Sequence, residues 1–209
     1  MKTVLAFGDS LTWGFDPTTR GRHPRSFRWP VALAEGLPET EVISEGLCGR
    51  TTVFDDPTDP ADRCGLRALP IALNSHAPLD LVVIMLGTND LKPNICGYAA
   101  EIEKGMQRLI RVIQDIKIDR PGCSTPAVLL VSPPPQVPSG DLHSPARIAE
   151  SEKLASHYQA LAQRLNVDFF DAATICSASP VDGVHLSAED TQALGKALIP
   201  LCREILDRA

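Results

Sequence analysis

The chain has 209 residues, of which 44% are hydrophobic, and its net charge is −6 at pH 7. This length and apolar content suit one globular domain over residues 1–209. The acidic balance, without a basic stripe, argues against a nucleic-acid partner. The first apolar run, residues 4–7, is too short for a signal peptide, and no stretch reaches the ~18 apolar residues of a membrane span. The sequence therefore predicts a cytoplasmic protein with no membrane partner.

Strand-like and helix-like segments alternate along the chain. Apolar runs typical of strands occupy residues 4–7, 41–44, 79–86, 127–132 and 167–170. The third run is continuously apolar from Leu81 to Leu86, as expected for a strand that is buried on both faces. We therefore expect five parallel strands, because parallel neighbours need crossover connections such as helices.

Helical periodicity fills three of the intervals between and after these runs. Apolar residues three or four positions apart are Ile102, Met106, Leu109, Ile113 and Ile116, then Ala155, Tyr158, Leu161, Ala162 and Leu165, and finally Leu194, Ala197, Leu198, Leu201 and Ile205. Ser187 and Asp190 form a candidate capping box before the last of these helices. The predicted architecture is α/β, a three-layer α/β/α sandwich around a five-stranded parallel sheet, with a flavodoxin-like arrangement.

Two polar segments interrupt this alternation. Residues 16–28 carry four arginines, and residues 132–145 carry three consecutive prolines and two more. Both are expected to be ordered surface loops, with lids or subunit contacts as open alternatives. A homo-oligomer is therefore one of the alternatives that the sequence leaves open.

The six cysteines are expected to be free thiols. They lie at wide, unequal intervals, and no Cys-x-x-Cys pair occurs, which argues against a zinc site or a redox dithiol. They are Cys48, Cys64, Cys96, Cys123, Cys176 and Cys202. We expect neither a metal nor another cofactor.

Polar residues with catalytic potential follow the predicted strands. In a parallel sheet the loops at the carboxyl ends of the strands gather at one edge. That edge should collect Ser10 from a Gly-Asp-Ser turn, the glycine-rich segment 46–50, Asn89 from Gly-Thr-Asn-Asp, and the pair Asp182 and His185. A hydroxyl, an imidazole and a carboxylate are the nucleophile, general base and orienting group of acyl transfer.

Each of these residues also has a purely structural interpretation. A Gly-Asp-Ser sequence is often only a turn, and Asn89 could hydrogen-bond its own backbone. Asp182 and His185 could bracket a tight turn or supply half of a metal site, but no second cluster at ligand spacing supports a metal. The other histidines, His23, His76, His143 and His157, are expected on the surface or in loops. Chance explains the four segments poorly when they are taken together.

The four segments resemble the conserved blocks of the SGNH hydrolases, also called the GDSL esterase/lipase family. The blocks run, in the expected order, through Phe7-Gly8-Asp9-Ser10-Leu11-Thr12, Glu45-Gly46-Leu47-Cys48-Gly49-Arg50-Thr51-Thr52, Gly87-Thr88-Asn89-Asp90 and Asp182-Gly183-Val184-His185. Three shorter stretches, residues 10–14, 55–60 and 131–135, resemble the bacterial arylesterase and acyltransferase branch. The resemblance implies the SGNH hydrolase fold over nearly the whole chain.

The resemblance also implies a role for each residue of the blocks. Ser10 would be the nucleophile, His185 the base and Asp182 its partner. The oxyanion hole would comprise the backbone N–H groups of Ser10 and Gly49 and the side-chain amide of Asn89. Close relatives often have serine and alanine where this chain has Cys48 and Gly49, which should alter the pocket more than the chemistry.

Two neighbouring residues refine this interpretation. Thr12 stands where the second glycine of a Gly-x-Ser-x-Gly elbow would be, which argues against the α/β-hydrolase fold. Asp9 is not needed in a triad, so a structural role is expected for it.

The side chains near Ser10 suggest an apolar wall for the substrate. Leu11, Trp13 and Phe15 would form this wall, and Cys48 would border it. We expect a serine esterase that hydrolyses short-chain aryl or alkyl esters through an acyl-enzyme on Ser10, and the resemblance adds acyl transfer to alcohols or peroxide. The alternatives are a carbohydrate O-deacetylase or acyl thioesterase on the same scaffold. A flavodoxin-like anion-binding module is a different class, which would need neither Asn89 nor His185.

Overall fold

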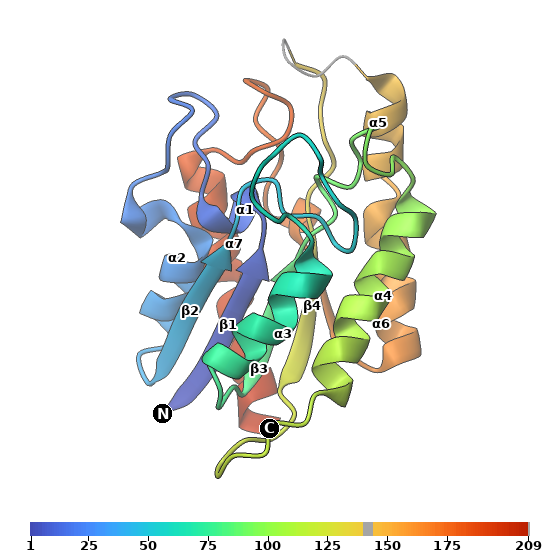
Figure 1. Ribbon diagram of the computed structural model, residues 1–209. Helices are drawn as coiled ribbons and strands as arrows, with labels where there is room; N and C mark the ends of the chain where they lie inside the picture. The colour runs from blue at the N-terminus through green and yellow to red at the C-terminus, as the bar shows by residue number, and fades with distance from the viewer. Residues whose placement is uncertain (140–143, 209) are drawn as a thin grey trace.

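A five-stranded parallel sheet forms the centre of the protein (Figure 1). The structure is a computed structural model, which describes residues 1–139 and 144–208. The strands are β1 (Lys2–Gly8), β2 (Thr40–Gly46), β3 (Leu81–Met85), β4 (Ala127–Ser132) and β5 (Asp168–Asp171). Their order across the sheet is β2-β1-β3-β4-β5, and every neighbouring pair is parallel. The predicted strand number and direction are confirmed, and the order is the flavodoxin-like one.

Helices cover both faces of the sheet, which confirms the three-layer sandwich. One face carries α3 (Gly65–Ser75), α4 (Ala99–Asp115) and α6 (Leu154–Leu165), and the other carries α2 (Trp29–Gly36) and α7 (Ala188–Arg208). Alternate residues of β1 serve the two layers. Leu5 and Phe7 pack with the first set of helices, whereas Val4 and Ala6 pack with the second. This alternation explains why β1 is apolar throughout.

The three periodic segments form the helices that the sequence predicts, α4, α6 and α7. Ser187 caps α7, because its hydroxyl oxygen accepts the N–H of Asp190 at 3.0 Å. The Ser187 hydroxyl in turn donates to the Asp190 carboxylate at 2.8 Å. In a standard capping box, that carboxylate would instead accept the backbone N–H of Ser187. The cap is therefore a variant of the expected capping box.

Several helices were not predicted, and their sequences explain why. Pro70 lies inside α3, and α2 has a proline at its start and only eight residues. The 16–28 loop contains a short 3-10 helix, Arg25–Phe27. Within the predicted 132–145 loop, residues 133–139 are irregular, residues 140–143 lie outside the described residues, and α5 (Pro145–Ser151) begins at the end.

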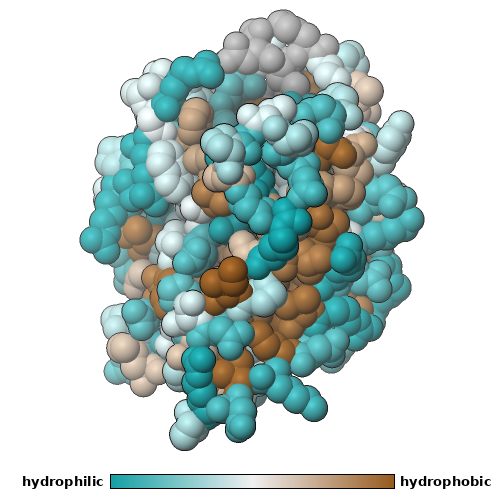
Figure 2. Space-filling model, in the orientation of Figure 1, coloured by the Kyte–Doolittle hydropathy of each residue, from teal (hydrophilic) through white to brown (hydrophobic). Residues whose placement is uncertain are grey.

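The surface around α3 and α4 mixes apolar and hydrophilic side chains (Figure 2). Ile71 of α3 is 67% exposed.

Among the helices that the structure describes, none has both the length and the apolar character that crossing a bilayer requires.

Candidate active site

The segments that follow β1, β2 and β3 meet the loop before α7 at the carboxyl edge of the sheet. The chain leaves β1, forms β2 on one side, and later returns to form β3 on the other side of β1. This reversal is the position at which doubly wound sheets bind ligands. The sequence therefore places its polar loops at the topological switch point.

Ser10 begins a single helical turn, α1 (Ser10–Trp13), directly after β1. Asp9 caps this turn, because its Oδ1 accepts the N–H of Leu11 at 2.9 Å. The short helix fixes the Ser10 side chain where the sequence predicted only a turn. Gly46 allows this arrangement, since a Cβ there would lie 2.3 Å from the backbone nitrogen of Trp13.

Ser10, His185 and Asp182 form a continuous hydrogen-bonded chain. Ser10 Oγ lies 2.9 Å from His185 Nε2, and His185 Nδ1 lies 2.6 Å from Asp182 Oδ2. Because Nδ1 donates its proton to the carboxylate, Nε2 is left to accept the proton of the Ser10 hydroxyl. The geometry is that of a nucleophile, a base and an orienting acid.

Asp182 is held in its ionised form. Its Oδ1 accepts the backbone N–H groups of Val184 and His185, each at 2.9 Å. Burial raises the pKa of Asp182, but the hydrogen bonds from the His185 ring and from these N–H groups outweigh it and lower the pKa to about 2. The carboxylate is therefore charged wherever an imidazole base can work.

Two aromatic side chains of the first loop pack against the histidine segment. The rings of Phe15 and His185 lie 4.2 Å apart between centroids. His23 Nε2 donates to the carbonyl oxygen of Leu186 at 3.1 Å. His23 lies in a loop, which agrees with the expectation of a surface or loop position, and it is only 4% exposed. Its hydrogen bond joins the 16–28 loop to the residue beside His185.

Three N–H donors suitable for an oxyanion gather near Ser10. Within residues 1–139 and 144–208, the backbone N–H groups of Ser10 and Gly49 donate to no other protein atom. Gly49 has a φ of +81°, a conformation that favours glycine. Asn89 Nδ2 donates to the Arg50 carbonyl at 3.0 Å and reaches Asp9 Oδ2 at a longer 3.4 Å. One amide hydrogen of Asn89 thus makes a normal hydrogen bond to Arg50, whereas the other makes only a long hydrogen bond to Asp9.

Buried polar side chains brace these donors, although the sequence analysis assigned no role to these side chains. Arg50 Nη1 donates to the carbonyl oxygens of Gly8, at 2.9 Å, and Glu45, which joins the ends of β1 and β2. Asp90 accepts the N–H of Thr52 at 2.9 Å, which joins the β2 and β3 loops. Arg50, Thr52 and Asp90 all lie inside the motif blocks, so their position was the only available signal.

The residues expected to form the substrate wall separate into two groups. Leu11 is 3% exposed and packs in the core beneath α1, so it supports Ser10 rather than lining open space. Trp13 is partly exposed and carries the Arg22 guanidinium 4.7 Å above its ring. Cys48 is half-buried. Burial raises the pKa of its thiol, and the nearby charge of Asp9 raises it further. All six cysteines are free thiols in the structure.

Phe15 lines a small cavity beside the triad. The cavity has a volume of about 210 Å³, and it is bordered by Phe15, Pro17, Arg20, Arg147, Val184 and the two triad members Asp182 and His185. Apolar and cationic side chains thus share the space next to the imidazole.

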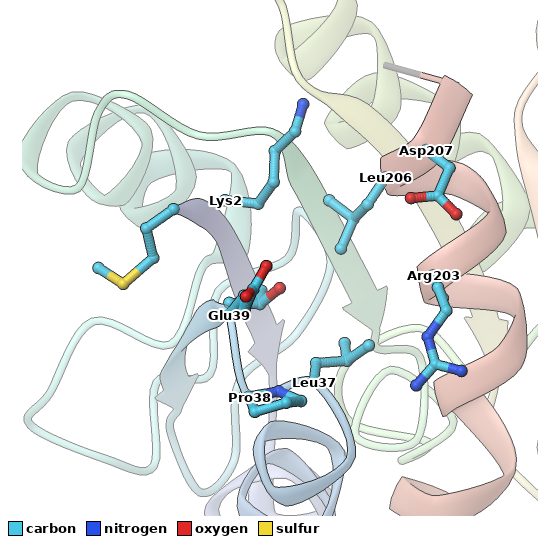
Figure 3. A pocket seen from close by; sticks show the side chains of 9 residues that line it. Lys2, Leu37, Pro38, Glu39, Arg203, Leu206 and Asp207 are labelled. Atoms are coloured by element: carbon cyan, nitrogen blue, oxygen red, sulfur yellow. The ribbon is translucent and has the colours of Figure 1, made fainter.

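A larger cavity of about 680 Å³ lies at the opposite end of the sheet (Figure 3). Lys2 in its wall pairs with Asp80 at 3.1 Å, and Arg203 donates to the Gly36 carbonyl at 3.0 Å. Its remaining side chains include Leu37, Glu39, Leu206 and Asp207. The smaller cavity is the candidate site, because no base or nucleophile with a matching partner borders the larger one among the described residues.

Solved structures resemble this fold over almost its full length. A carbohydrate acetylesterase family member from Sinorhizobium meliloti is 44% identical, with a TM-score of 0.96, and the match covers 99% of this chain and 100% of that one. The native aryl esterase of M. smegmatis is 40% identical, with a TM-score of 0.91, and the match covers 98% of this chain and 100% of that one. No curated protein sequence matches this chain.

A family model agrees with these structures. The GDSL-like Lipase/Acylhydrolase family matches residues 6–192, which include all four sequence blocks. The chain is a carboxylic ester hydrolase with a small-molecule substrate, and it belongs to the GDSL-like lipase/acylhydrolase family, with the SGNH hydrolase fold that its motifs predict.

Proposed function

We propose that the protein is a serine esterase that cleaves short-chain aryl or alkyl esters through an acyl-enzyme on Ser10. The supporting observation is the hydrogen-bonded chain in which Ser10 Oγ lies 2.9 Å from His185 Nε2 and His185 Nδ1 lies 2.6 Å from Asp182. A serine hydroxyl is a poor nucleophile unless a base takes its proton, and this geometry supplies that base.

The reaction proceeds in two matched halves. Ser10 Oγ attacks the carbonyl carbon of the ester while its proton passes to His185 Nε2. The tetrahedral intermediate then collapses, the bond to the alcohol oxygen breaks, and Nε2 returns the proton to that oxygen. Water repeats the sequence on the acyl-enzyme and releases the carboxylic acid. Asp182 remains ionised throughout and stabilises the imidazolium.

The oxyanion hole would provide much of the rate enhancement. The negative charge of the tetrahedral intermediate would be met by the N–H groups of Ser10 and Gly49 and by the Asn89 amide. Donors that are already in place stabilise this charge without reorganisation. Their positions are supported by the Arg50 carbonyl behind Asn89 and by the left-handed backbone of Gly49.

Substitution of the nucleophile tests the proposal directly. Ser10→Ala should fold normally and lower kcat/KM for 4-nitrophenyl acetate by at least roughly 10³-fold, since only binding and oxyanion stabilisation remain. It should also lose labelling by a fluorophosphonate probe. Ser156→Ala, at an exposed position of α6, is the matched control and should keep both properties. Retention of more than about a tenth of the activity in folded Ser10→Ala would place the nucleophile elsewhere.

Acyl length tests the short-chain part of the proposal. Trp13 and Phe15 lie close to the nucleophile, and each accommodated methylene would otherwise add ~0.8 kcal/mol of binding. We therefore expect kcat/KM to fall from acetyl or butyryl to octanoyl esters of 4-nitrophenol. Added alcohol should give some ester product, because apolar side chains retain an organic alcohol near the acyl-enzyme. Rising activity through octanoyl would contradict the first expectation, and the absence of any transfer product would contradict the second.

A second candidate is carbohydrate O-deacetylation. It is favoured by the Sinorhizobium meliloti relative, which is described as a carbohydrate acetylesterase family member. A panel of acetylated sugars and acyl thioesters, measured beside the nitrophenyl esters, separates this candidate and the thioesterase alternative from the proposed function. The cytoplasmic location and the homo-oligomer stay predictions.

A further inference from the structure

Arg147 places an unpaired cation in the wall of the cavity beside the triad. It lies in the first turn of α5, where its backbone N–H donates to Ser144 Oγ, the cap of that helix. Its side chain borders the same 210 Å³ cavity as His185 and Asp182. Within residues 1–139 and 144–208, its guanidinium makes no hydrogen bond or ion pair, and its Nε is buried without an acceptor.

Among the residues that the structure describes, nothing around Arg147 offsets the cost of burying its charge. Burial lowers the pKa of Arg147, and no carboxylate of the described residues opposes that effect. The first turn of a helix also disfavours a cation, because the helix dipole is positive there. Arg50 shows the contrast, since its buried guanidinium donates to the carbonyl oxygens of Gly8 and Glu45. A partly buried cation with no partner in the described part of the chain requires an explanation beyond stability.

Asp182 does not provide the missing partner, although it borders the same cavity. Both of its carboxylate oxygens are engaged, one by the His185 ring and the other by the N–H groups of Val184 and His185. The free hydrogen-bond donors of Arg147 therefore remain available to a ligand. A planar guanidinium matches a carboxylate best, because it can donate two parallel hydrogen bonds.

The position of the cavity indicates which part of the substrate it receives. His185 Nε2 must return its proton to the oxygen of the departing alcohol. The alcohol part of the ester therefore lies near His185 Nε2, and His185 is one of the residues that border this cavity. Phe15, Pro17 and Val184 give the cavity apolar walls around this group.

We propose that this cavity is a subsite for the alcohol part of the substrate and that Arg147 binds a carboxylate on it. The substrate class is then short-chain O-acyl esters of hydroxycarboxylic acids, acidic sugars included. This proposal rests on the proposed esterase function and specifies its substrate. Arg147 is the residue that selects the anionic substrate, and the triad chemistry is unchanged.

The test compares two esters that differ only in charge on the alcohol part, 3-acetoxybenzoate and 3-acetoxybenzamide. The ratio of their kcat/KM values is measured for the wild type, Arg147→Met, Arg147→Lys and Arg108→Met. The last variant removes the same charge from an exposed position on α4. Arg147→Met should lower the ratio by about tenfold or more, since a charge-assisted hydrogen bond is lost. Arg147→Lys should restore part of it, and Arg108→Met should leave it unchanged.

Several results would overturn the subsite. An unchanged ratio in folded Arg147→Met is one, and a charge preference found only with the carboxylate on the acyl part, in monophenyl adipate, is another. If Arg147→Met does not fold, inhibition of the wild type decides: 3-hydroxybenzoate should inhibit about tenfold more strongly than 3-hydroxybenzamide, and equal inhibition overturns the proposal. Cleavage of the neutral amide ester by every variant tests the esterase function separately.

Discussion

At the scale of single residues, the environment sorts three neighbouring carboxyl groups into different states. Asp182 is held ionised by hydrogen bonds, with a pKa of about 2. Asp9 and Asp90 are fully buried, and burial raises the pKa of each to about 6 despite the hydrogen bonds from Leu11 and Thr52. Hence Asp182 can orient the base at any working pH, whereas Asp9 and Asp90 remain costly to ionise.

The first prediction concerns stability and pH at Asp9. Its pKa is 3.8 in the unfolded chain and about 6 in the folded protein, so the folded protein binds more protons between these values and loses stability as pH rises through them. Asp9→Asn removes this loss and keeps an amide oxygen to accept the Leu11 N–H. From pH 4 to 7.5, the free energy of unfolding of the variant should therefore gain on the order of 2–3 kcal/mol relative to the wild type.

Urea unfolding at the two pH values measures this difference. Asp119→Asn, at an exposed position, provides the control and should follow the wild type. Parallel pH dependences for Asp9→Asn and the wild type would show that Asp9 ionises at no cost in the folded protein.

The second prediction concerns Asn89 as an oxyanion donor. Asn89→Ala should lower kcat by on the order of 10²–10³-fold with little change in KM, because its amide meets charge that develops only in the transition state. Asn74→Ala, on the exposed side of α3, is the control. A change confined to KM would assign Asn89 to substrate binding.

At the scale of elements, two helices position the proposed catalytic side chains at or just before their first residues. Ser10 begins α1, and His185 precedes α7 by three residues. Each helix begins with a side-chain cap, Asp9 for α1 and Ser187 for α7. The caps fix where each helix begins and therefore where the neighbouring catalytic residue lies.

The third prediction tests the cap of α7. Ser187→Ala should lower the free energy of unfolding by about 1 kcal/mol, because the N–H of Asp190 loses its acceptor. Thermal or urea unfolding measures this loss. The kcat value should stay close to that of the wild type, because the hydrogen bonds among Ser10, His185 and Asp182 do not involve Ser187. If Ser187→Ala reduced kcat at unchanged stability, the hydroxyl would act on the histidine loop rather than on the helix.

At the scale of the whole molecule, two hydrophobic layers share one sheet. Leu109 of α4 belongs to the layer of α3, α4 and α6, and Leu33 of α2 belongs to the layer of α2 and α7. Both are fully buried. Because alternate residues of β1 enter both layers, loss of packing in one should weaken the other, and the chain should behave as one domain.

The fourth prediction follows from this coupling. Leu109→Ala and Leu33→Ala should each lower the free energy of unfolding by about 2–5 kcal/mol and shift a single transition. Tryptophan fluorescence, which reports on Trp29 in the α2 layer and on Trp13 in α1, should coincide with far-UV circular dichroism in both variants. Two separate transitions in Leu109→Ala would show that the layers unfold independently.

The sequence predicted those features that depend on strong local patterns. Continuous apolar runs indicated the strands, and regular spacing indicated α4, α6 and α7. The gathering of loops at the carboxyl ends of parallel strands indicated that the segments around Ser10, Asn89 and His185 would meet. The sequence did not predict α3, because Pro70 masks the helical pattern. It also did not predict the burial of His23, which depends on the distant carbonyl of Leu186. Arg147 was also missed, since only the folded chain places it beside the histidine.

The triad joins residues that are far apart in the chain, because 175 positions separate Ser10 from His185. The proposed nucleophile lies in the connection that follows the first strand, whereas its proposed base lies between the last strand and the last helix. A partly folded chain therefore holds an inert serine until the β5–α7 unit has docked. Recovery of ester hydrolysis during refolding consequently reports the docking of the β5–α7 unit onto the β1–α1 turn.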